Sequence, residues 1–395
     1  PATTAAPAPE AAAEPEVPDN PDEGVTSDEI LIGWMGDLTG PTASGQGPGN
    51  HGTLAAIECL NERGGVFGRQ VTVISEDDMF SGEQGLINFT KLVDDDKVLA
   101  ITYVGGSHIG EGILPDVEYA GIAVIGPPTT TDALTFSDQY FTNTPHYGDQ
   151  ADVIVAEMAR RVGGSENMIV FGISFGVPSG REFAAYVKHE VIKAGGTYVG
   201  TSYMPPAATE ATAQIVALQE AISESGANVL TIHGSQGGGA IILNSMVDAG
   251  ITDMQVGGIH GVAVIPFFEE LPVEIRDNVF AVHGFLPANN DYEGAAEMRR
   301  CADLAGYDGE WDHPLFAHGF LNGVIIEQAL LRAGEQSGEL TRASVTAALH
   351  GEFDTLGISC PIDWSTVTHS PCATALALGE GGELEPVNPF EYYAE

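Results

Sequence analysis

Basic residues are scarce in this chain of 395 residues. Lysine and arginine together number 14, against 56 aspartates and glutamates, which gives a formal net charge of −42. A surface of this sign repels the phosphates of nucleic acids and the headgroups of anionic membranes, so neither is an expected partner. An acidic surface also favours solubility in high salt, which screens the repulsion, and this suggests a halophilic or marine source.

Long apolar runs are absent as well. No stretch approaches the roughly 18 apolar residues that a membrane-spanning helix needs, so we expect a soluble chain. The first residue is Pro1 rather than methionine, and no signal peptide is recognisable. We therefore expect that a targeting segment has been removed from this end.

Cysteine is rare, since only Cys59, Cys301, Cys360 and Cys372 occur. The even number permits two disulfides. Residues 360 and 372 flank a predicted hairpin, which favours a bridge between them and leaves Cys59 to pair with Cys301. The 11 histidines show no metal-ligand spacing, and the sequence has no phosphate-binding loop and no GxGxxG. We expect neither a metal nor a cofactor.

The first 27 residues consist largely of alanine, proline and glutamate and show no apolar periodicity. Such a segment cannot offset the entropy lost on ordering, so residues 1–27 are expected to form a disordered linker. It could tether a globular body to a lipid anchor at a membrane. The alternative is a disordered end without a role.

Strands and helices alternate from Ile30 onward. The apolar run at residues 30–35 predicts a buried strand, followed by a Gly- and Pro-rich loop over residues 37–47 and a helix over about 52–61. Further strands are expected at residues 71–74, 98–104, 122–125, 168–173, 197–203, 229–232, 255–259 and 279–284, mostly with helices between them. This rhythm predicts an α/β fold with parallel sheets, in which ligands bind beyond the carboxyl ends of the strands.

Short motifs along the chain occur in an order that resembles a known family. They are Ile32-Gly33, Leu38-Thr39-Gly40-Pro41, residues 61–69 (NERGGVFGR), Asp77-Asp78, Gly106-Ser107 and Ile125-Gly126-Pro127. Together they resemble the leucine/isoleucine/valine-binding-like proteins, which are type I periplasmic substrate-binding proteins of ABC transporters. The resemblance is distributed over about residues 28–390.

The resemblance implies two doubly wound parallel-sheet lobes joined by a three-segment hinge. Lobe 1 would comprise residues 28–143 plus 286–354, and lobe 2 residues 145–282 plus 358–395. The crossovers would lie at Thr144-Pro145, His283-Gly284-Phe285 and Thr355-Leu356-Gly357. A ligand would bind in the cleft between the lobes, which would close by hinge motion.

The same resemblance implies a function and its partners. We expect a periplasmic or otherwise extracytoplasmic monomer that carries a small-molecule ligand to an ABC transporter permease. A sensor component that uses the same cleft is an alternative that the sequence leaves open.

Hydroxyl side chains follow two adjacent predicted strands. Ser107 and Thr129-Thr130 fall where free backbone N–H groups meet, which suits a carboxylate. The resemblance implies that these positions hold the carboxylate of the ligand; helix capping is the alternative. Thr39 and Ser44 are further candidates. Phe175 resembles the family's aromatic wall, with core packing as the alternative.

His260 falls where amino-acid-binding members of the family carry an acidic residue that pairs with the ligand's ammonium group. An imidazole supplies no negative charge, so we expect a ligand without an ammonium group, such as a dicarboxylate, an aromatic acid or an amide. His233 and His108 are further site candidates, and each histidine has a plain structural role as its alternative. Asp37 or Glu111 could instead hold an ammonium group.

One motif points to a different class of protein. Residues 172–176 read GxSxG after a strand, as in the nucleophile elbow of serine hydrolases, with Ser174 as the nucleophile and Asp253 and His283 downstream. The helix of such an elbow starts at once, whereas residues 177–180 insert a turn here. We therefore expect a binding protein rather than an enzyme.

Overall fold

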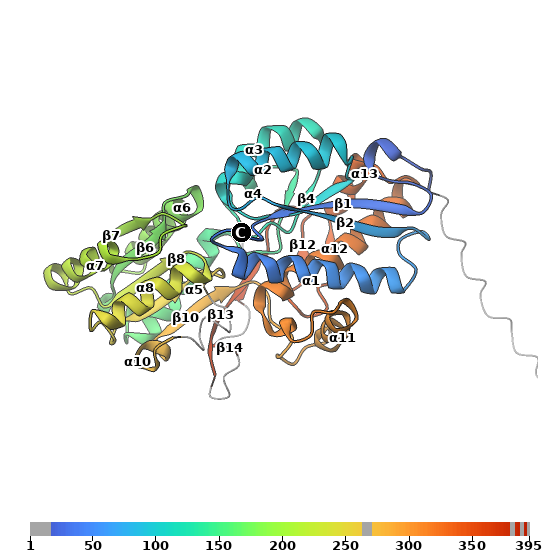
Figure 1. Ribbon diagram of the computed structural model, residues 1–395. Helices are drawn as coiled ribbons and strands as arrows, with labels where there is room; N and C mark the ends of the chain where they lie inside the picture. Colours follow the sequence, from blue (N-terminus) through green and yellow to red (C-terminus); the bar gives the residue numbers. More distant parts are fainter. Residues whose placement is uncertain (1–16, 263–270, 380–383, 388–390, 393–395) are drawn as a thin grey trace, which may run out of the picture.

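The computed structural model describes residues 17–262, 271–379, 384–387 and 391–392. It contains two α/β lobes, each with helices on both faces of its own sheet (Figure 1). The predicted fold class is confirmed. Within the described residues, no helix combines the length and the apolar character needed to cross a membrane.

The sheet of lobe 1 is parallel throughout. It contains β1 (Glu29–Gly36), β2 (Gln70–Asp77), β3 (Ala100–Val104), β4 (Val124–Ile125) and β5 (Tyr140–Phe141), in the order β2-β1-β3-β4-β5. Successive side chains of β1 point to opposite faces of the sheet, and apolar side chains occur on both faces. Ile30 and Ile32 belong to one buried cluster and Met35 to the other.

Helices from both halves of the chain cover this sheet. One face carries α2 (Gly82–Thr90) and α3 (Ser107–Ala120), and the other carries α1 (Ala43–Glu62) and α12 (Pro314–Ser337) (Figure 1). The remaining helices of lobe 1 are α4 (Asp132–Thr135), α11 (Ala295–Ala305) and α13 (Arg342–Leu349). Lobe 1 is therefore assembled from segments on either side of lobe 2 in the sequence.

The sheet of lobe 2 is mixed. Its parallel part contains β6 (Ile169–Phe175), β7 (Thr197–Met204), β8 (Val229–His233), β9 (Gln255–Gly258) and β10 (Val279–His283). The antiparallel strands β13 (Cys372–Leu378) and β14 (Leu384–Pro386) complete the order β14-β13-β10-β9-β8-β6-β7, and β15 (Glu391–Tyr392) pairs with β13. The helices are α5 (Tyr147–Arg161), α6 (Pro178–Lys193), α7 (Thr212–Ser225), α8 (Gln236–Asp248) and α10 (Val273–Arg276).

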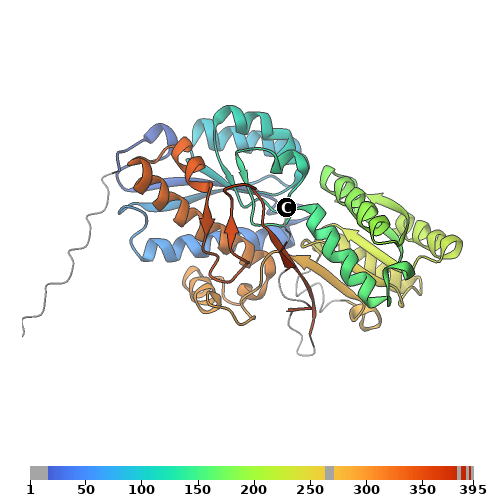
Figure 2. The same cartoon turned by 180° about the vertical axis from the view of Figure 1, so that it is seen from behind.

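The chain passes between the lobes three times. It leaves lobe 1 between β5 and α5 and returns between β10 and α11. The third passage lies later than the predicted Thr355-Leu356-Gly357, because β12 (Ile362–Asp363) still pairs with β11 (Glu352–Phe353) beside α13, and Trp364 packs on Phe141 of lobe 1. The chain then crosses before β13, which extends alongside α5 in lobe 2 (Figure 2).

The predicted loop over residues 37–47 is wrong beyond Thr42, because α1 begins at Ala43. Gly52 of α1 and Gly319 of α12 allow the two helices to pack closely. A Cβ atom added to Gly52 would lie 2.1 Å from the carbonyl oxygen of Phe316 in α12, and one added to Gly319 would lie 1.8 Å from that of Gly49. Only glycine permits this approach of α1 and α12.

The predicted linker does not reach residue 27. Val17 is buried, and the guanidinium of Arg69 donates hydrogen bonds to the carbonyls of Val17 and Thr26, at 2.7 and 2.6 Å. These contacts hold residues 17–27 against lobe 1. Residues 1–16 lie outside the described part of the chain, so a linker over that stretch stays a prediction.

Both predicted disulfides are confirmed. Cys59 of α1 is bonded to Cys301 of α11, and Cys360 is bonded to Cys372. The prediction of a hairpin between residues 360 and 372 is wrong. The strands β12 and β13 do not pair with each other, since β12 pairs with β11 and β13 pairs with β10 and β14.

Candidate ligand site

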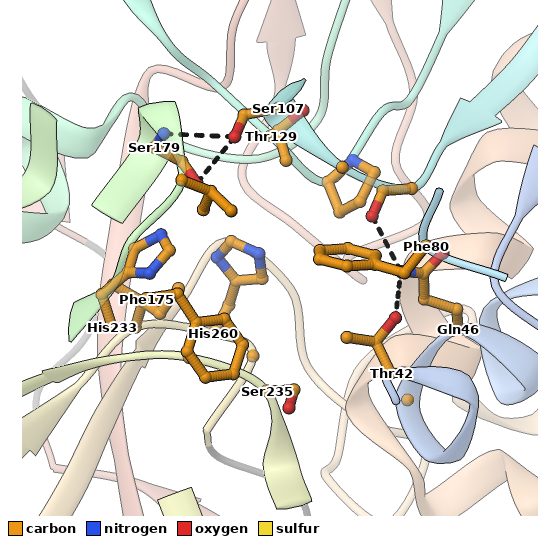
Figure 3. A pocket seen from close by; sticks show the side chains of 18 of the residues that line it. Thr42, Gln46, Phe80, Ser107, Thr129, Phe175, Ser179, His233, Ser235 and His260 are labelled. Atoms are coloured by element: carbon orange, nitrogen blue, oxygen red, sulfur yellow. Dashed lines mark hydrogen bonds between the residues drawn. The ribbon is translucent and has the colours of Figure 1, made fainter. Parts of the chain in front are cut away.

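A cavity of about 90 Å³ lies between the two lobes, and we call it the cleft cavity. Its walls come from the residues that follow the strands of both sheets, which is where open α/β sheets bind ligands. The lining residues are Thr42, Gly45, Gln46, Phe80, Tyr103, Gly105, Gly106, Ser107, Pro128, Thr129, Tyr147, Phe175, Val177, Ser179, His233, Gly234, Ser235, Gln236, Ile259, His260, Gly261 and Leu315. Figure 3 shows side chains of both lobes around this common space.

The wall from lobe 1 combines hydroxyls with aromatic rings. Ser107 is the first residue of α3, and Thr129 follows β4. The Oγ1 atom of Thr129 is buried and has no hydrogen-bond partner among the described residues. Phe80 and Tyr103 hold positive φ angles of 57° and 61°. Such backbone strain costs about 1–3 kcal/mol per residue and is typical of ligand sites.

Phe175 forms the aromatic part of the wall from lobe 2. It is the last residue of β6, and the N-terminal turn of α8 packs directly on its ring. A Cβ atom added to Gly238 would lie 2.7 Å from that ring. The glycine run that begins α8 thus fixes the position of the phenyl group at the cavity.

The two lobes touch at one edge of the cleft cavity. Ser107 Oγ donates to Ser179 Oγ at 2.9 Å, and the backbone N–H of Ser179 donates to Ser107 Oγ at 3.1 Å (Figure 3). Nearby, the backbone N–H of Asp132 in lobe 1 donates to the carboxylate of Glu182 in α6 at 3.0 Å. These bonds join the lobes, so the structure represents a closed arrangement.

The same inter-lobe contact contains a group of potential metal ligands, Asp132, His146 and Glu182. His146 Nδ1 accepts from the backbone N–H of Gly148 at 3.1 Å, so its proton resides on Nε2, which lies 2.9 Å from Asp132 Oδ1. Tyr186 donates to the same carboxylate oxygen at 2.8 Å. These hydrogen bonds connect the two lobes and help to hold them together.

His233 and His260 both line the cleft cavity and are buried. Burial lowers the pKa of His233 to about 3 and that of His260 to about 4; the nearby Pro128 carbonyl opposes the shift at His260. Both imidazoles are therefore neutral near pH 7. Neither ring nitrogen of His233 has a hydrogen-bond partner among the described residues.

Charged side chains are missing from the described lining of the cleft cavity. Asp37 is buried, but its carboxylate accepts hydrogen bonds from the N–H groups of Gly40 and Thr42 and from the Thr42 hydroxyl. Glu111 lies on α3 and is not among the lining residues. The cavity thus presents no carboxylate for an ammonium group.

Positive potential at the cleft cavity comes from backbone dipoles. The helices α3, α5, α6 and α8, with 14, 15, 16 and 13 residues, begin at or beside lining residues. Helix N-termini carry partial positive charge and unpaired N–H groups, which favour an anion or an acceptor oxygen.

Among the predicted site residues, the structure brings five to the cleft cavity, namely Ser107, Thr129, Phe175, His233 and His260. The other four lie away from it. The Thr130 hydroxyl donates to the Pro145 carbonyl, His108 Nε2 contacts the Phe80 carbonyl at 3.1 Å, and the exposed Thr39 donates to Asp77. Ser44 is exposed on the first turn of α1.

Sequence reasoning missed several lining residues, including Thr42, Gln46, Phe80, Tyr147, Ser179 and Ser235. The rule that located Ser107, a hydroxyl at a helix start after a strand, would also have located Ser179 and Ser235. No comparable signal marked Gln46, because it lies in the segment that was read as a loop.

The GxSxG motif does not form a nucleophile elbow. Ser174 is buried inside β6, opposite Tyr203 and His233 on the neighbouring strands, and α6 begins only at Pro178. His283 lies on β10, and two strands separate β10 from β6. The serine and the histidine therefore do not meet.

A family model described as "Periplasmic binding protein" matches residues 29–379. The chain belongs to this family. A Leu/Ile/Val-binding protein homolog from Brucella melitensis is 24% identical over 235 residues, which cover 58% of this chain and 61% of that protein. The match to this relative therefore spans less than two thirds of its length.

Solved structures of periplasmic binding proteins share the fold along nearly the whole chain. A branched-chain amino acid ABC transporter protein from Thermus thermophilus with bound valine superposes with a TM-score of 0.82 at 19% identity, covering 93% of this chain and 97% of that one. An R. palustris solute-binding protein in complex with 4-hydroxybenzoate superposes with a TM-score of 0.79 at 15% identity. The match covers 92% of this chain and 97% of that one.

Proposed function

We propose that this periplasmic binding protein captures a small organic ligand in the cleft cavity and delivers it to an ABC transporter permease. The observation that carries the proposal is the position of the cavity, which both lobes line and which the Ser107–Ser179 contact closes. A ligand that contacts both walls stabilises the closed arrangement, which a permease can distinguish from the open one. The work is binding and release rather than catalysis.

We propose an extracytoplasmic location, as the family name implies. The two disulfides support it, because disulfides persist in oxidising compartments such as the periplasm. Attachment to the membrane through residues preceding Val17, and a monomeric state, stay predictions.

The ligand is a carboxylate or an amide rather than a standard amino acid. The lining offers hydroxyls, two neutral imidazoles and helix N-termini, which suit acceptor oxygens, and it offers no carboxylate to pair with an ammonium group. The neighbours named above were solved with valine and with 4-hydroxybenzoate, so this fold accommodates ligands with and without an ammonium group.

Five predicted residues and two added ones are proposed as ligand contacts, namely Ser107, Thr129, Phe175, His233, His260, Phe80 and Ser179. The rings of Phe80 and Phe175 come from opposite lobes and supply the apolar contact area. Ser107 and Thr129 supply hydroxyl groups beside the N-terminus of α3.

The test is a thermal-unfolding screen on protein stripped of bound ligand by unfolding and refolding. The panel pairs leucine and valine with 4-methyl-2-oxopentanoate, isovalerate, benzoate, isovaleramide and benzamide. A ligand at 100 times its Kd should stabilise the protein by about 2.7 kcal/mol. We expect stabilisation by acids or amides and none by leucine or valine; stabilisation by the amino acids alone would refute the ligand class.

A matched pair of variants locates the binding site. Phe80→Ala removes a ring from the cleft cavity and should weaken binding of any ligand that the screen finds. Phe136→Ala removes a ring that is 83% exposed in lobe 1 and should leave binding unchanged. Equal effects of both variants would place the ligand elsewhere.

A further inference from the structure

The cleft cavity has no fixed charge on its lining, yet the proposed ligand class includes anions. A carboxylate transferred from water into such a cavity loses hydration that helix N-termini replace only in part. The only lining side chains that can gain a positive charge near neutral pH are His233 and His260.

His260 is placed to take up a proton. Its Nδ1 atom lies 3.3 Å from Gln150 Oε1. The amide nitrogen of Gln150 donates to the Pro145 carbonyl at 2.7 Å, which fixes the amide so that its oxygen faces the imidazole. The Pro128 carbonyl, from lobe 1, lies near the same ring and favours its protonated form.

Two acceptor oxygens therefore lie near an imidazole that, when neutral, has a single N–H. The imidazolium form has an N–H on each nitrogen, so it can donate to Gln150 of lobe 2 and still turn a second donor toward lobe 1. In the ligand-free cavity, burial disfavours the imidazolium form of His260, because no carboxylate of the described lining balances its charge.

The other titratable groups around His260 do not supply that balance. Among the described residues, the phenols of Tyr103 and Tyr147 line the same cavity and stay neutral, because burial raises their pKa. The others are imidazoles on three other elements: His233 on β8, His283 on β10 with its ring centroid 6.4 Å away, and His318 on α12. A charge on any of them would repel a charge on His260. An anionic ligand is the partner that the ring lacks.

We propose that the cleft cavity binds a monocarboxylic acid together with one proton, which His260 holds. This inference rests on the proposed function and deepens it. The ligand anion and a proton from solvent enter, an imidazolium–carboxylate pair forms in the cavity, and the complex carries the same net charge as the free protein. Closure then adds no uncompensated charge to the interior, and the imidazolium keeps its hydrogen bond to Gln150.

The test is isothermal titration calorimetry with benzoate and isovalerate at pH 7, in phosphate and in Tris, which differ in ionisation enthalpy. The difference between the two heats counts the protons taken up, and we expect one per acid bound. The acid's affinity should weaken about tenfold when the pH rises from 6 to 7. Benzamide and isovaleramide should bind with no proton uptake and no such slope.

His260→Gln tests the assignment, because glutamine keeps a hydrogen-bond donor but cannot hold the proton. This variant should lose the proton uptake and the pH slope for acids while it still binds the amides, which also reports that it is folded. His189→Gln is the control, since the His189 side chain is 70% exposed on α6 and lies outside the cleft cavity; it should keep both the affinity and the proton count.

Three outcomes would overturn the inference. The first is acid binding without proton uptake, which would leave the proposed binding function intact. The second is uptake that persists in His260→Gln. The third is an absence of binding by both acids, which would remove the acid class from the proposed function as well.

Discussion

Ser107 of lobe 1 and Ser179 of lobe 2 share two hydrogen bonds across the cleft, at 2.9 and 3.1 Å. Each serine stands in the first turn of a long helix, α3 and α6, so the contact also brings two helix N-termini to one point. Closure of the lobes and the electrostatic character of the cavity therefore depend on the same pair of residues.

Substitution of these serines should weaken closure. Ser107→Ala removes both hydrogen bonds and Ser179→Ala only one, because the second runs from the backbone of Ser179. At about 1 kcal/mol per bond, the Kd of a bound ligand should rise roughly 5-fold for Ser179→Ala and roughly 30-fold for Ser107→Ala. Calorimetry gives the affinities, and X-ray scattering reports the fraction of closed protein.

Ser44→Ala is the control for this pair, since Ser44 is exposed on α1 outside the cleft cavity. It should bind as the wild type does. Indistinguishable affinities for Ser44→Ala and Ser107→Ala would show that the serine contact does not contribute to closure.

Two glycines of α1 should respond in opposite ways to alanine. A Cβ atom on Gly47 meets nothing within 4 Å outside its chain neighbours, so Gly47→Ala gains about 0.5–1 kcal/mol of helix propensity, of which crowding against Pro48 offsets a part. A Cβ atom on Gly52 meets the Phe316 carbonyl oxygen at 2.1 Å. Gly52→Ala should therefore separate α1 from α12 and destabilise by several kcal/mol or prevent folding.

Urea unfolding compares the two glycine variants. A stable Gly52→Ala protein with an unchanged midpoint would mean that α1 and α12 do not pack as closely as described. Gly47→Ala controls for the general effect of a methyl group in this helix.

Asp78 should give the stability a pH dependence. Its carboxyl group is buried, and this burial, with the nearby charges of Asp37 and Asp77, raises its pKa from 3.8 to about 7. Between these values the folded chain keeps a proton that the unfolded chain has released. The stability contributed by this group thus falls as the pH rises from 4 to 7, by at most about 1.4 kcal/mol per pH unit.

Asp78→Asn removes that dependence, so its stability relative to wild type should increase steadily from pH 5 to pH 7. Asp116→Asn, on the exposed side of α3, is the matched control. Parallel pH profiles of Asp78→Asn and wild type in urea unfolding would contradict the placement of Asp78 in the protein interior.

The acidic surface predicts a response to salt. With 56 acidic and 14 basic residues, charge repulsion should weaken the folded state at low ionic strength, and screening should relieve it. Raising NaCl from about 0.2 M to about 2 M should increase the thermal midpoint more than sorbitol of equal osmolality does. A midpoint that falls with added NaCl would count against adaptation to high salt.

Much of this architecture was predictable because the pattern that specifies it is local. Apolar runs such as residues 30–35 give buried strands, and the motifs around Gly106-Ser107 locate the loops at the strand ends. The resemblance pointed to His260, which does line the cleft cavity; that the ligand lacks an ammonium group stays a prediction.

The errors arose where a distant segment decides the structure. The stretch that begins α1 looks like a loop because it is rich in glycine, and the contacts of Gly45 and Gly52 with α12, more than 250 positions later, are not visible in the local sequence. Ser44 and Ser107 are both hydroxyls near a helix start, but Gly45, next to Ser44, faces Leu315 and so turns Ser44 to solvent. The order in residues 17–27 depends on Arg69, which composition does not reveal.

The disulfide between Cys59 and Cys301 has a consequence for how the protein is made. The bond spans 242 positions and joins α1 to α11, both in lobe 1, while all the parallel strands of lobe 2 lie between these helices in the sequence. The bond can form only after the chain has been made as far as Cys301, so the amino-terminal half of lobe 1 must wait until β6 to β10 of lobe 2 are present. The strands β13 and β14, which complete the sheet of lobe 2, lie beyond Cys301, as do α12 and α13 of lobe 1. Neither lobe is therefore complete when this bond first becomes possible.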